Sequence, residues 1–325
     1  MIIAQISHGL GNQMFQYAAA RRLAEVHRTS LKLDVYSYSQ NQYFYSVNQT
    51  RRYGLGHFNI QADLATWREI TRLSPLEGLQ RSLRSCLGDK LSHLAVRALN
   101  KAGIRSPYYF RTDRYDPAKP LPKLMVGRVV SERLYHFDPG VLDCPNDVCL
   151  TGYWQSDKYF KDISEIIRRE LTVKTPLQGQ NLEVARQIQA CESVSLHVRR
   201  GDKAKQAHHF ATTVEYCKNV VKYFRARLPR PQFFVFSDDC DWARENLADE
   251  SDLVFVTHNA DEANYEDLRL MSLCKHNSMA PSSFSWWGAW LNQNPDKIVL
   301  RPRALFNMSN HDTKDACPPD WLVLD

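Results

Sequence analysis

Residues 193–202 read SVSLHVRRGD, and this stretch decides the class of fold that the sequence predicts. Its first half, Ser193–Val198, alternates apolar with small polar side chains and is typical of a buried strand. The end of this strand and the residues just beyond it carry an imidazole, two guanidiniums and a carboxylate, at His197, Arg199, Arg200 and Asp202. Open α/β sheets bind ligands at the carboxyl ends of their strands, and guanidinium forks bond the paired oxygens of a diphosphate. Taken alone, the motif fits surface salt bridges equally well.

The chain that follows this stretch alternates helices and strands. Helices are expected at Thr213–Leu228, Trp242–Leu247, Asn264–Lys275 and Phe284–Gln293, and strands at Phe233–Phe236, Leu253–Val256 and Ile298–Leu300. This alternation predicts a parallel sheet covered by helices.

The amino-terminal part predicts a second unit of the same kind. A strand at Ile2–Ile6 is followed by a glycine loop at Ser7–Gln13, an Ala-rich helix at Met14–Val26 and a strand at Leu31–Asp34. Two further helices are expected at Asp63–Leu73 and Leu79–Asn100. The predicted linker is Lys174–Gln180, so we expect an amino-terminal, acceptor-side domain over residues 1–175 and a carboxyl-terminal, nucleotide-binding domain over residues 176–325.

Charge is distributed unevenly along the chain. The 325 residues carry a net charge of +6, whereas the segment from Arg51 to Leu134 holds 16 Lys and Arg against 7 Asp and Glu. Such a segment suits nucleic acid, an anionic membrane surface or a phosphorylated ligand, and a solvated helical surface explains it as well. Its leucines at helical spacing favour a core-facing helix, with peripheral membrane contact as the alternative. We expect no nucleic-acid partner, because arginines interleaved with base-stacking aromatics in a known module pattern are missing.

Cysteine usage and hydropathy predict a cytoplasmic location. The eight Cys occur singly, with no CxxC pair and no Cys/His spacing suited to zinc. The chain opens directly on a strand-like run, which leaves no room for a signal peptide, and no window approaches the roughly 18 apolar residues of a spanning helix. We therefore expect reduced thiols.

Two more polar groups fall at the same predicted sheet edge as the arginines. Asp238 and Asp239 follow one strand, and Ser282 and Ser283 open a helix. A carboxylate can accept two hydrogen bonds from a guanine, and hydroxyls beside the free N–H groups of a helix start bind anions. Helix capping is the alternative for all four residues. Because three groups converge on one edge, the sequence favours a nucleotide diphosphate as the ligand.

The glycine loop supplies candidates from the other unit. Gly9 and Gly11 form a GxG without the third glycine of a dinucleotide fingerprint, so we expect them to let the backbone approach a ligand shared between the domains. Asn12 and Gln13 would then point their amides into the interdomain cleft.

Two shorter motifs complete the candidate set. Tyr153, Trp154 and Gln155 combine aromatic and amide groups, which is typical of sugar-binding clefts, with packing as the alternative. The sequence Asp239-Cys240-Asp241 is similar to a metal-binding DxD. Since guanidiniums and a helix start can already neutralise a diphosphate, we predict no metal.

These motifs resemble those of GDP-fucose-dependent fucosyltransferases. HVRRGD at 197–202 is similar to the HxRRxD motif of the α1,2-, α1,6- and O-fucosyltransferases. Four other segments resemble the α1,2-fucosyltransferase family and stand in family order: GLGNQMFQYA at 9–18, GYWQS with KYF at 152–160, FVFSDD at 234–239 and SSFSWWGAWL at 282–291. The chain is thus identified as a member of the bacterial α1,2-fucosyltransferase family.

The resemblance implies a GT-B architecture, in which two Rossmann-like domains face each other across a cleft. It implies inverting, metal-independent transfer of L-fucose from GDP-β-L-fucose to the 2-hydroxyl of a galactose. Arg199 would hold the β-phosphate and stabilise the departing GDP, Asn12 would act near the fucose, and Asp202 would orient the arginines. The donor would contact His197, Arg200, Asp238, Asp239, Ser282, Ser283, Phe284, Gly9, Gly11 and Gln13, and the acceptor Tyr153, Trp154 and Gln155.

The general base stays open at this point. The α1,6 relatives carry a Glu five residues past the motif Asp, where this chain has Ala207. His8, His208 and His209 are alternatives, as is a dissociative reaction that needs only weak base help. Two other functions compete with α1,2-fucosyl transfer, namely a non-catalytic carbohydrate-binding module and transfer of another GDP-linked sugar.

Overall fold

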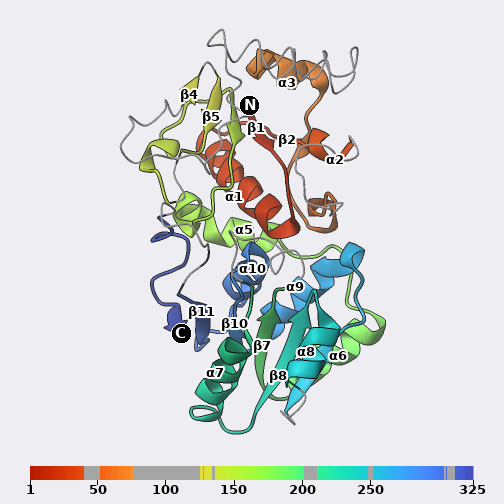
Figure 1. Ribbon diagram of the computed structural model, residues 1–325. Coiled ribbons are helices and arrows are strands. Elements are labelled where there is room, and N and C mark those ends of the chain that lie inside the picture. Colours follow the sequence, from red (N-terminus) through yellow and green to blue (C-terminus); the bar gives the residue numbers. More distant parts are fainter. Residues whose placement is uncertain are drawn as a thin grey trace, which may run out of the picture.

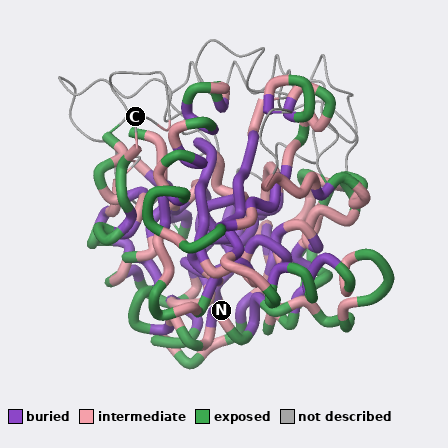
Figure 2. Tube along the Cα trace, turned by 90° about the horizontal axis from the view of Figure 1, so that it is seen from below, coloured by how far each residue is buried: buried purple, intermediate pink, exposed green. Residues whose placement is uncertain are grey.

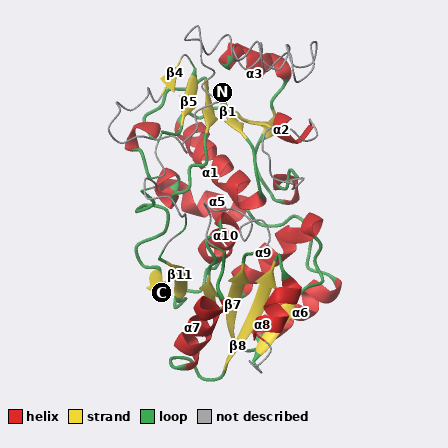
Figure 3. Cartoon of the chain, viewed as in Figure 1, coloured by secondary structure: helices red, strands yellow, loops and turns green. Residues whose placement is uncertain are grey.

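The computed structural model describes residues 1–39, 52–75, 125–126, 128–133, 136–200, 211–247, 252–303, 305 and 312–324. Within these ranges the chain forms two six-stranded sheets, and every strand of one comes from the first half of the chain. One sheet lies in the upper and one in the lower part of Figure 1, with α1, α5 and α10 between them. Figure 3 shows the same separation of the strands into two groups. The predicted α/β protein with two Rossmann-like units is confirmed.

The amino-terminal sheet has the strand order β3-β2-β1-β6-β5-β4. Its strands are β1 (Ile2–Gln5), β2 (Leu31–Asp34), β3 (Asp63–Leu64), β4 (Met125–Val126), β5 (Val129–Ser131) and β6 (Val148–Thr151). Only the β4–β5 pair is antiparallel among these. The predicted strands at 2–6 and 31–34 are confirmed. Asp63–Leu64 was predicted helical and instead pairs with β2.

Helices α1 (Leu10–Val26), α2 (Tyr36–Ser39), α3 (Trp67–Leu73) and α5 (Ser164–Glu170) belong to this half. Helix α3 starts where it does because Thr66 and Glu69 form a capping box. Helix α1 begins at Leu10, four residues before the predicted start, so the second half of the predicted glycine loop is its first turn. The predicted helix at 79–100 and most of the basic segment lie outside the described residues.

The carboxyl-terminal sheet has the order β12-β11-β10-β7-β8-β9 and is parallel throughout its described strands. They are β7 (Glu192–Val198), β8 (Pro231–Ser237), β9 (Leu253–Val256), β10 (His276–Ser278), β11 (Val299–Pro302) and β12 (Leu322–Leu324). The helices are α6 (Gly179–Gln189), α7 (Val214–Arg225), α8 (Cys240–Leu247), α9 (Asn264–Leu273) and α10 (Ser283–Leu291). All strands and helices predicted after residue 193 are present.

Both faces of this sheet are covered by helices, as alternation along β8 shows. Phe233 and Val235 pack in one apolar cluster with residues of α7 and α8. Phe234 and Phe236 pack in another with residues of α6 and α9. Because side chains of a strand point alternately to opposite faces, a continuous apolar run is what a doubly covered strand requires.

Three elements here were not predicted: α6 and β10, whose residues lack the usual signals, and β12, which follows the strand at Ile298–Leu300 that was predicted to be the last. The start of α6, Gly179, falls inside the predicted linker Lys174–Gln180. Strand β10 has the sequence His276-Asn277-Ser278, is buried and lies between β7 and β11. Asn277 is accommodated because its amide donates to Ser195 Oγ at 2.8 Å and to the Met271 carbonyl at 2.9 Å.

The largest apolar core joins the two sheets. It extends from Ile2 on β1 through α1 to the tryptophans of α10. The ring of Phe15 lies 4.4 Å from that of Trp286 and 4.9 Å from that of Trp287. Helix α1 is therefore buried on nearly all sides, and Figure 2 shows buried backbone running through the middle of the molecule. The two halves consequently share one core at this junction.

Candidate active site

The first turns of α1 and α10 meet where the two halves join. A Cβ atom added to Gly11 would lie 2.5 Å from the Ser283 carbonyl carbon and 2.6 Å from the Phe284 nitrogen. Trp287 Nε1 donates to the Gly11 carbonyl at 2.9 Å. Gly11 thus makes room for the start of α10, and its predicted approach to a ligand stays a prediction. A Cβ atom added to Gly9 would meet no atom within 4 Å, so space is open there.

Asn12 is fixed from both halves of the molecule. Its Oδ1 accepts hydrogen bonds from Ser283 Oγ at 2.9 Å and from Gln155 Nε2 at 2.7 Å. These contacts orient the amide, because they place the oxygen toward two donors and the nitrogen on the other side. The structure therefore brings together three of the predicted site residues.

Gln13, by contrast, serves the fold. It is fully buried, and its Nε2 donates to the carbonyls of His8 at 3.0 Å and Arg52 at 2.8 Å. Its Oε1 accepts from the Gly54 nitrogen at 2.8 Å. The prediction that the Gln13 amide points into the cleft is wrong, since all its polar atoms bond the backbone of its own half.

Arg199 is held at the carboxyl end of β7 by Asp238, which follows β8. Arg199 Nη1 lies 3.0 Å from Asp238 Oδ2, and the two side chains are 16% and 22% exposed. Asp238 Oδ1 also accepts from the Arg200 nitrogen at 2.8 Å. Asp238 thus performs the orienting role predicted for Asp202, which lies outside the described residues, and the predicted contact of Asp238 with guanine has no support in this arrangement.

The two adjacent arginines point to different neighbours. The Arg200 guanidinium carbon lies 3.9 Å from the centre of the Trp242 ring, and its Nη1 donates to the Thr212 carbonyl at 2.8 Å. These contacts hold it against α8. Arg200 is thus oriented by different neighbours from those of Arg199, and its contact with the donor stays a prediction.

For Asp239 and Ser282 the capping alternative is confirmed. Asp239 Oδ1 accepts from the Trp242 nitrogen at 3.3 Å in the first turn of α8. Ser282 Oγ accepts from the Phe284 nitrogen at 3.3 Å as the N-cap of α10. Both side chains are thereby assigned to helix starts.

His197 and Phe284 form the inner wall of the carboxyl-terminal side. His197, the next-to-last residue of β7, is 4% exposed, and its ring centre lies 5.8 Å from that of the half-buried Phe284. A planar ring and an imidazole at the carboxyl edge of the sheet suit a nucleobase.

The three predicted acceptor residues differ in where they lie. Trp154 is 1% exposed and packs edge-on against Tyr159 at 5.5 Å, so the prediction that it contacts a sugar is wrong. Tyr153 is half-buried, and its hydroxyl lies 3.2 Å from His8 Nε2. Gln155 is half-buried and bonds Asn12 as described above.

Two carboxyls with raised pKa values, the buried Glu132 and the half-buried Asp267, were not predicted. Burial raises the pKa of Glu132 to about 7 despite backbone hydrogen bonds from Tyr153 at 2.6 Å and Trp154 at 3.0 Å. Glu132 thus fixes the loop that carries Tyr153. Burial also raises the pKa of Asp267 on α9 to about 7, and Asn259 donates to it at 2.7 Å. Neither carboxyl belongs to a sequence motif, so only a three-dimensional arrangement could single them out.

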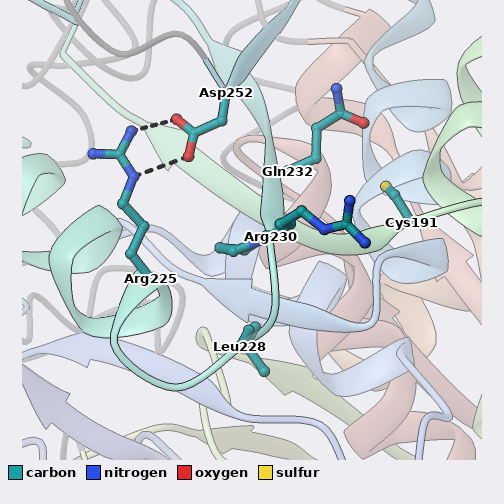
Figure 4. A pocket seen from close by; sticks show the side chains of 7 residues that line it. Cys191, Arg225, Leu228, Arg230, Gln232 and Asp252 are labelled. Atoms are coloured by element: carbon teal, nitrogen blue, oxygen red, sulfur yellow. Dashed lines mark hydrogen bonds and ion pairs between the residues drawn. The ribbon is translucent and has the colours of Figure 1, made fainter.

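A separate pocket lies at the opposite edge of the carboxyl-terminal sheet (Figure 4). Its lining includes Pro231 and Asp252, at the amino ends of β8 and β9, and Asp252 pairs there with Arg225 at 2.5 Å. Since Arg199 and Asp238 stand at the carboxyl ends of strands, this pocket is distinct from the candidate site.

The fold and this site together define a GT-B glycosyltransferase. The structure is similar to that of the fucosyltransferase NodZ from Bradyrhizobium, with a TM-score of 0.50, 13% identity, and coverage of 88% of this chain and 91% of that one. Residues 135–325 match the model of glycosyl transferase family 11. The chain belongs to this family.

Two relatives carry more specific names. The chain is 28% identical to an alpha-1,2-colitosyltransferase of Escherichia coli over 100% of this chain and 99% of the relative. It is 30% identical to galactoside alpha-(1,2)-fucosyltransferase 1 of Lagothrix lagotricha over 44% of this chain and 42% of the relative. Among the residues that the structure describes, no helix has the length and apolar character needed to cross a membrane.

Proposed function

We propose that the protein transfers L-fucose from GDP-β-L-fucose to the 2-hydroxyl of a galactose residue, forming an α1,2 linkage with inversion and without a required metal. The observation that carries the proposal is the Asn12 amide, which Ser283 and Gln155 fix from the two halves of the molecule. It bonds the first turn of α10, which suits a diphosphate, and the loop of Gln155, which suits a sugar. The similarity to an α1,2-fucosyltransferase supports the linkage and the galactose acceptor.

Arg199 binds the β-phosphate in this proposal. Its guanidinium is oriented by Asp238, and the N–H groups at the start of α10 supply further donors to the same anion. Negative charge grows on the diphosphate as the bond to fucose breaks, and an oriented guanidinium stabilises that charge without reorganising. This stabilisation takes the place of a metal ion.

The nucleoside lies against the carboxyl-terminal wall. Phe284 and His197 flank the guanine, and we assign Asp267 to the polar edge of the base. Asp267 suits this role because α9 follows β9, which places its first turns at the carboxyl edge of the sheet.

The fucose lies near Asn12, in the space beside Gly9. The Asn12 Nδ2 donates to the sugar or to the bridging oxygen, since the Oδ1 is already occupied by two donors. The acceptor enters from the side of Tyr153, with its 2-hydroxyl opposite the departing GDP, as a single inverting displacement requires.

The test is incubation of the full chain with GDP-fucose and lactose in the presence of EDTA, with product analysis by mass spectrometry and linkage by NMR. We expect an α1,2-fucosylated product. Arg199→Ala should lower turnover by about 100- to 1,000-fold, because it removes the charge on the leaving group. Arg227→Ala, at an exposed arginine in the turn that follows α7, is the matched control and should retain activity.

Transfer of another GDP-linked sugar is the second candidate, favoured by the full-length similarity to an α1,2-colitosyltransferase. Presenting GDP-fucose and GDP-colitose in competition separates the two. A preference for GDP-colitose would show that colitose, not fucose, is the sugar transferred. Glycan binding without any GDP binding would instead indicate a carbohydrate-binding module.

A further inference from the structure

The acceptor side of the site contains a histidine in a strained backbone conformation. His8 directly precedes Gly9, the N-cap of α1, and has a φ of 67°. This left-handed conformation is natural for glycine and unfavourable for a residue with a Cβ atom. The His8 carbonyl accepts hydrogen bonds from Gln13 Nε2 at 3.0 Å and Tyr38 Oη at 2.7 Å. The strain is therefore maintained by neighbours on both sides, as is typical of functional positions.

The imidazole of His8 is fixed at both ring nitrogens. Nδ1 lies 2.9 Å from Ser7 Oγ, and Nε2 lies 3.2 Å from the Tyr153 hydroxyl. The buried Gln16 orients Ser7, because its Nε2 donates to Ser7 Oγ at 3.1 Å and its Oε1 accepts from the Ser7 nitrogen at 2.9 Å. His8 thus connects a rigid set of uncharged groups to one phenol.

Of the two side chains His8 and Tyr153, the Tyr153 phenol is the one suited to contact a sugar. The rings of His8 and Tyr153 lie 5.0 Å apart at 52°, and both residues are half-buried, so each keeps exposed surface. Gln155 follows on the same loop and bonds Asn12 at 2.7 Å, which in turn bonds Ser283 of α10. A continuous series of contacts therefore leads from the His8–Tyr153 pair to the donor side.

We propose that His8 determines acceptor specificity by holding the Tyr153 phenol against the acceptor sugar, an inference that rests on the proposed transfer to a sugar hydroxyl. An aromatic ring with a polar tip packs on the apolar face of a pyranose and bonds one of its hydroxyls. Because the phenol is fixed through His8, only sugars that present a hydroxyl at that point bind well. His8 is a positioning residue in this account.

The test is His8→Gly in the full chain, because glycine adopts a φ of 67° without strain. We expect the melting temperature to be unchanged or higher, and GDP affinity by calorimetry and GDP-fucose hydrolysis without acceptor to be unchanged. The acceptor KM for lactose should rise by about tenfold with little change in kcat, as expected for the loss of one oriented hydrogen bond. Discrimination between lactose and free galactose should fall by the same factor.

Tyr153→Phe and a second histidine serve as controls. Tyr153→Phe keeps the ring, should raise the acceptor KM similarly, and should add little to His8→Gly in the double variant, because His8 acts through that hydroxyl. His27→Gln, at the opposite end of α1, keeps a donor to the Cys144 carbonyl and should change nothing.

An unchanged acceptor KM in His8→Gly would overturn the proposal. So would a lower kcat at constant KM that free imidazole restores, since that result would make His8 the proton acceptor. If the wild type neither hydrolyses nor transfers fucose, the proposed function fails while lactose binding in the presence of GDP, measured by calorimetry, still decides the role of His8. Equal lactose affinity in the wild type and His8→Gly would then reject it.

Discussion

The two sides of the candidate site differ in the kind of interaction that holds them. On the carboxyl-terminal side, charged groups dominate, with Arg199 paired to Asp238 and Arg200 stacked on Trp242. On the amino-terminal side, the neutral side chains of Gln13, Gln16 and Ser7 bond one another and the backbone. The difference matches the proposed substrates, since a diphosphate is best stabilised by oriented charge and a sugar by fixed neutral hydrogen bonds.

Gly11→Ala should separate the two sides of the site at their junction. Of the substitutions at Gly11, Ser283 and Glu132, it should lower turnover the most. The added Cβ atom would fall 2.5 Å from the backbone of Ser283, so the two helix starts must separate. We expect a loss of about 2 kcal/mol in the free energy of unfolding and a loss of roughly 100-fold in turnover. Gly9→Ala meets open space and should cost less than about 1 kcal/mol. Equal melting temperatures for the two variants would show that the close approach is unimportant.

Ser283→Ala should loosen the junction without separating it. The substitution removes one of two hydrogen bonds that orient Asn12. We expect turnover to fall by about tenfold at nearly constant stability. Ser282→Ala is the informative neighbour, because Ser282 caps α10 and its loss should lower the free energy of unfolding by about 1 kcal/mol. Steady-state kinetics and thermal unfolding of both variants measure the contrast, and a larger stability loss for Ser283→Ala would contradict it.

Glu132→Gln should change turnover least, because Glu132 bonds only the backbone of the loop that carries Tyr153, on the amino-terminal side of the site. The folded-state pKa of Glu132, about 7, lies above its ordinary value of 4.5, so the folded protein binds the proton more tightly than the unfolded chain does. Stability therefore falls as pH rises from about 4.5 to 7, by up to about 3 kcal/mol, and is constant in this respect above that range.

Denaturant unfolding between pH 4.5 and 8 tests this expectation. The decline should be weaker in Glu132→Gln, with a residual slope of the same sign from Asp267. Glu183→Gln, on the exposed surface of α6, should retain the wild-type slope. A wild-type stability that rises across this pH range would show that Glu132 is ionised in the folded protein.

Prediction from the sequence succeeded where a pattern is local and failed where neighbours decide. The strands and helices that were predicted after residue 193 follow from apolar runs and helical spacing, and each of them is present. Strand β10 has no such pattern, because the amide of Asn277 is satisfied by Ser195, 82 residues earlier, and by Asn292, 15 residues later. Helix α6 was obscured because its polar first turn resembles a linker.

The site shows the same division. Arg199, Asn12 and Ser283 could be chosen from their motifs, and the structure places them at the ends of strands and helices that converge. The direction in which each side chain points could not be read from the sequence, which is why the burial of Gln13 and Trp154 and the stacking of Arg200 on Trp242 were not predicted. Glu132 and Asp267 were missed because neither belongs to a sequence motif, and the burial that raises the pKa of each depends on tertiary packing.

The sequence by itself determined the α/β class, the family and the residue types that the chemistry needs, because periodicity and short motifs are properties of neighbouring residues. Only the tertiary structure decided which of those residues share a site. In the tertiary structure Gly11 contacts the start of α10, Asp238 orients Arg199, and His8 contacts the Tyr153 hydroxyl. These outcomes depend on distances between segments more than 30 residues apart, and such distances are set by how the two sheets pack on one shared core.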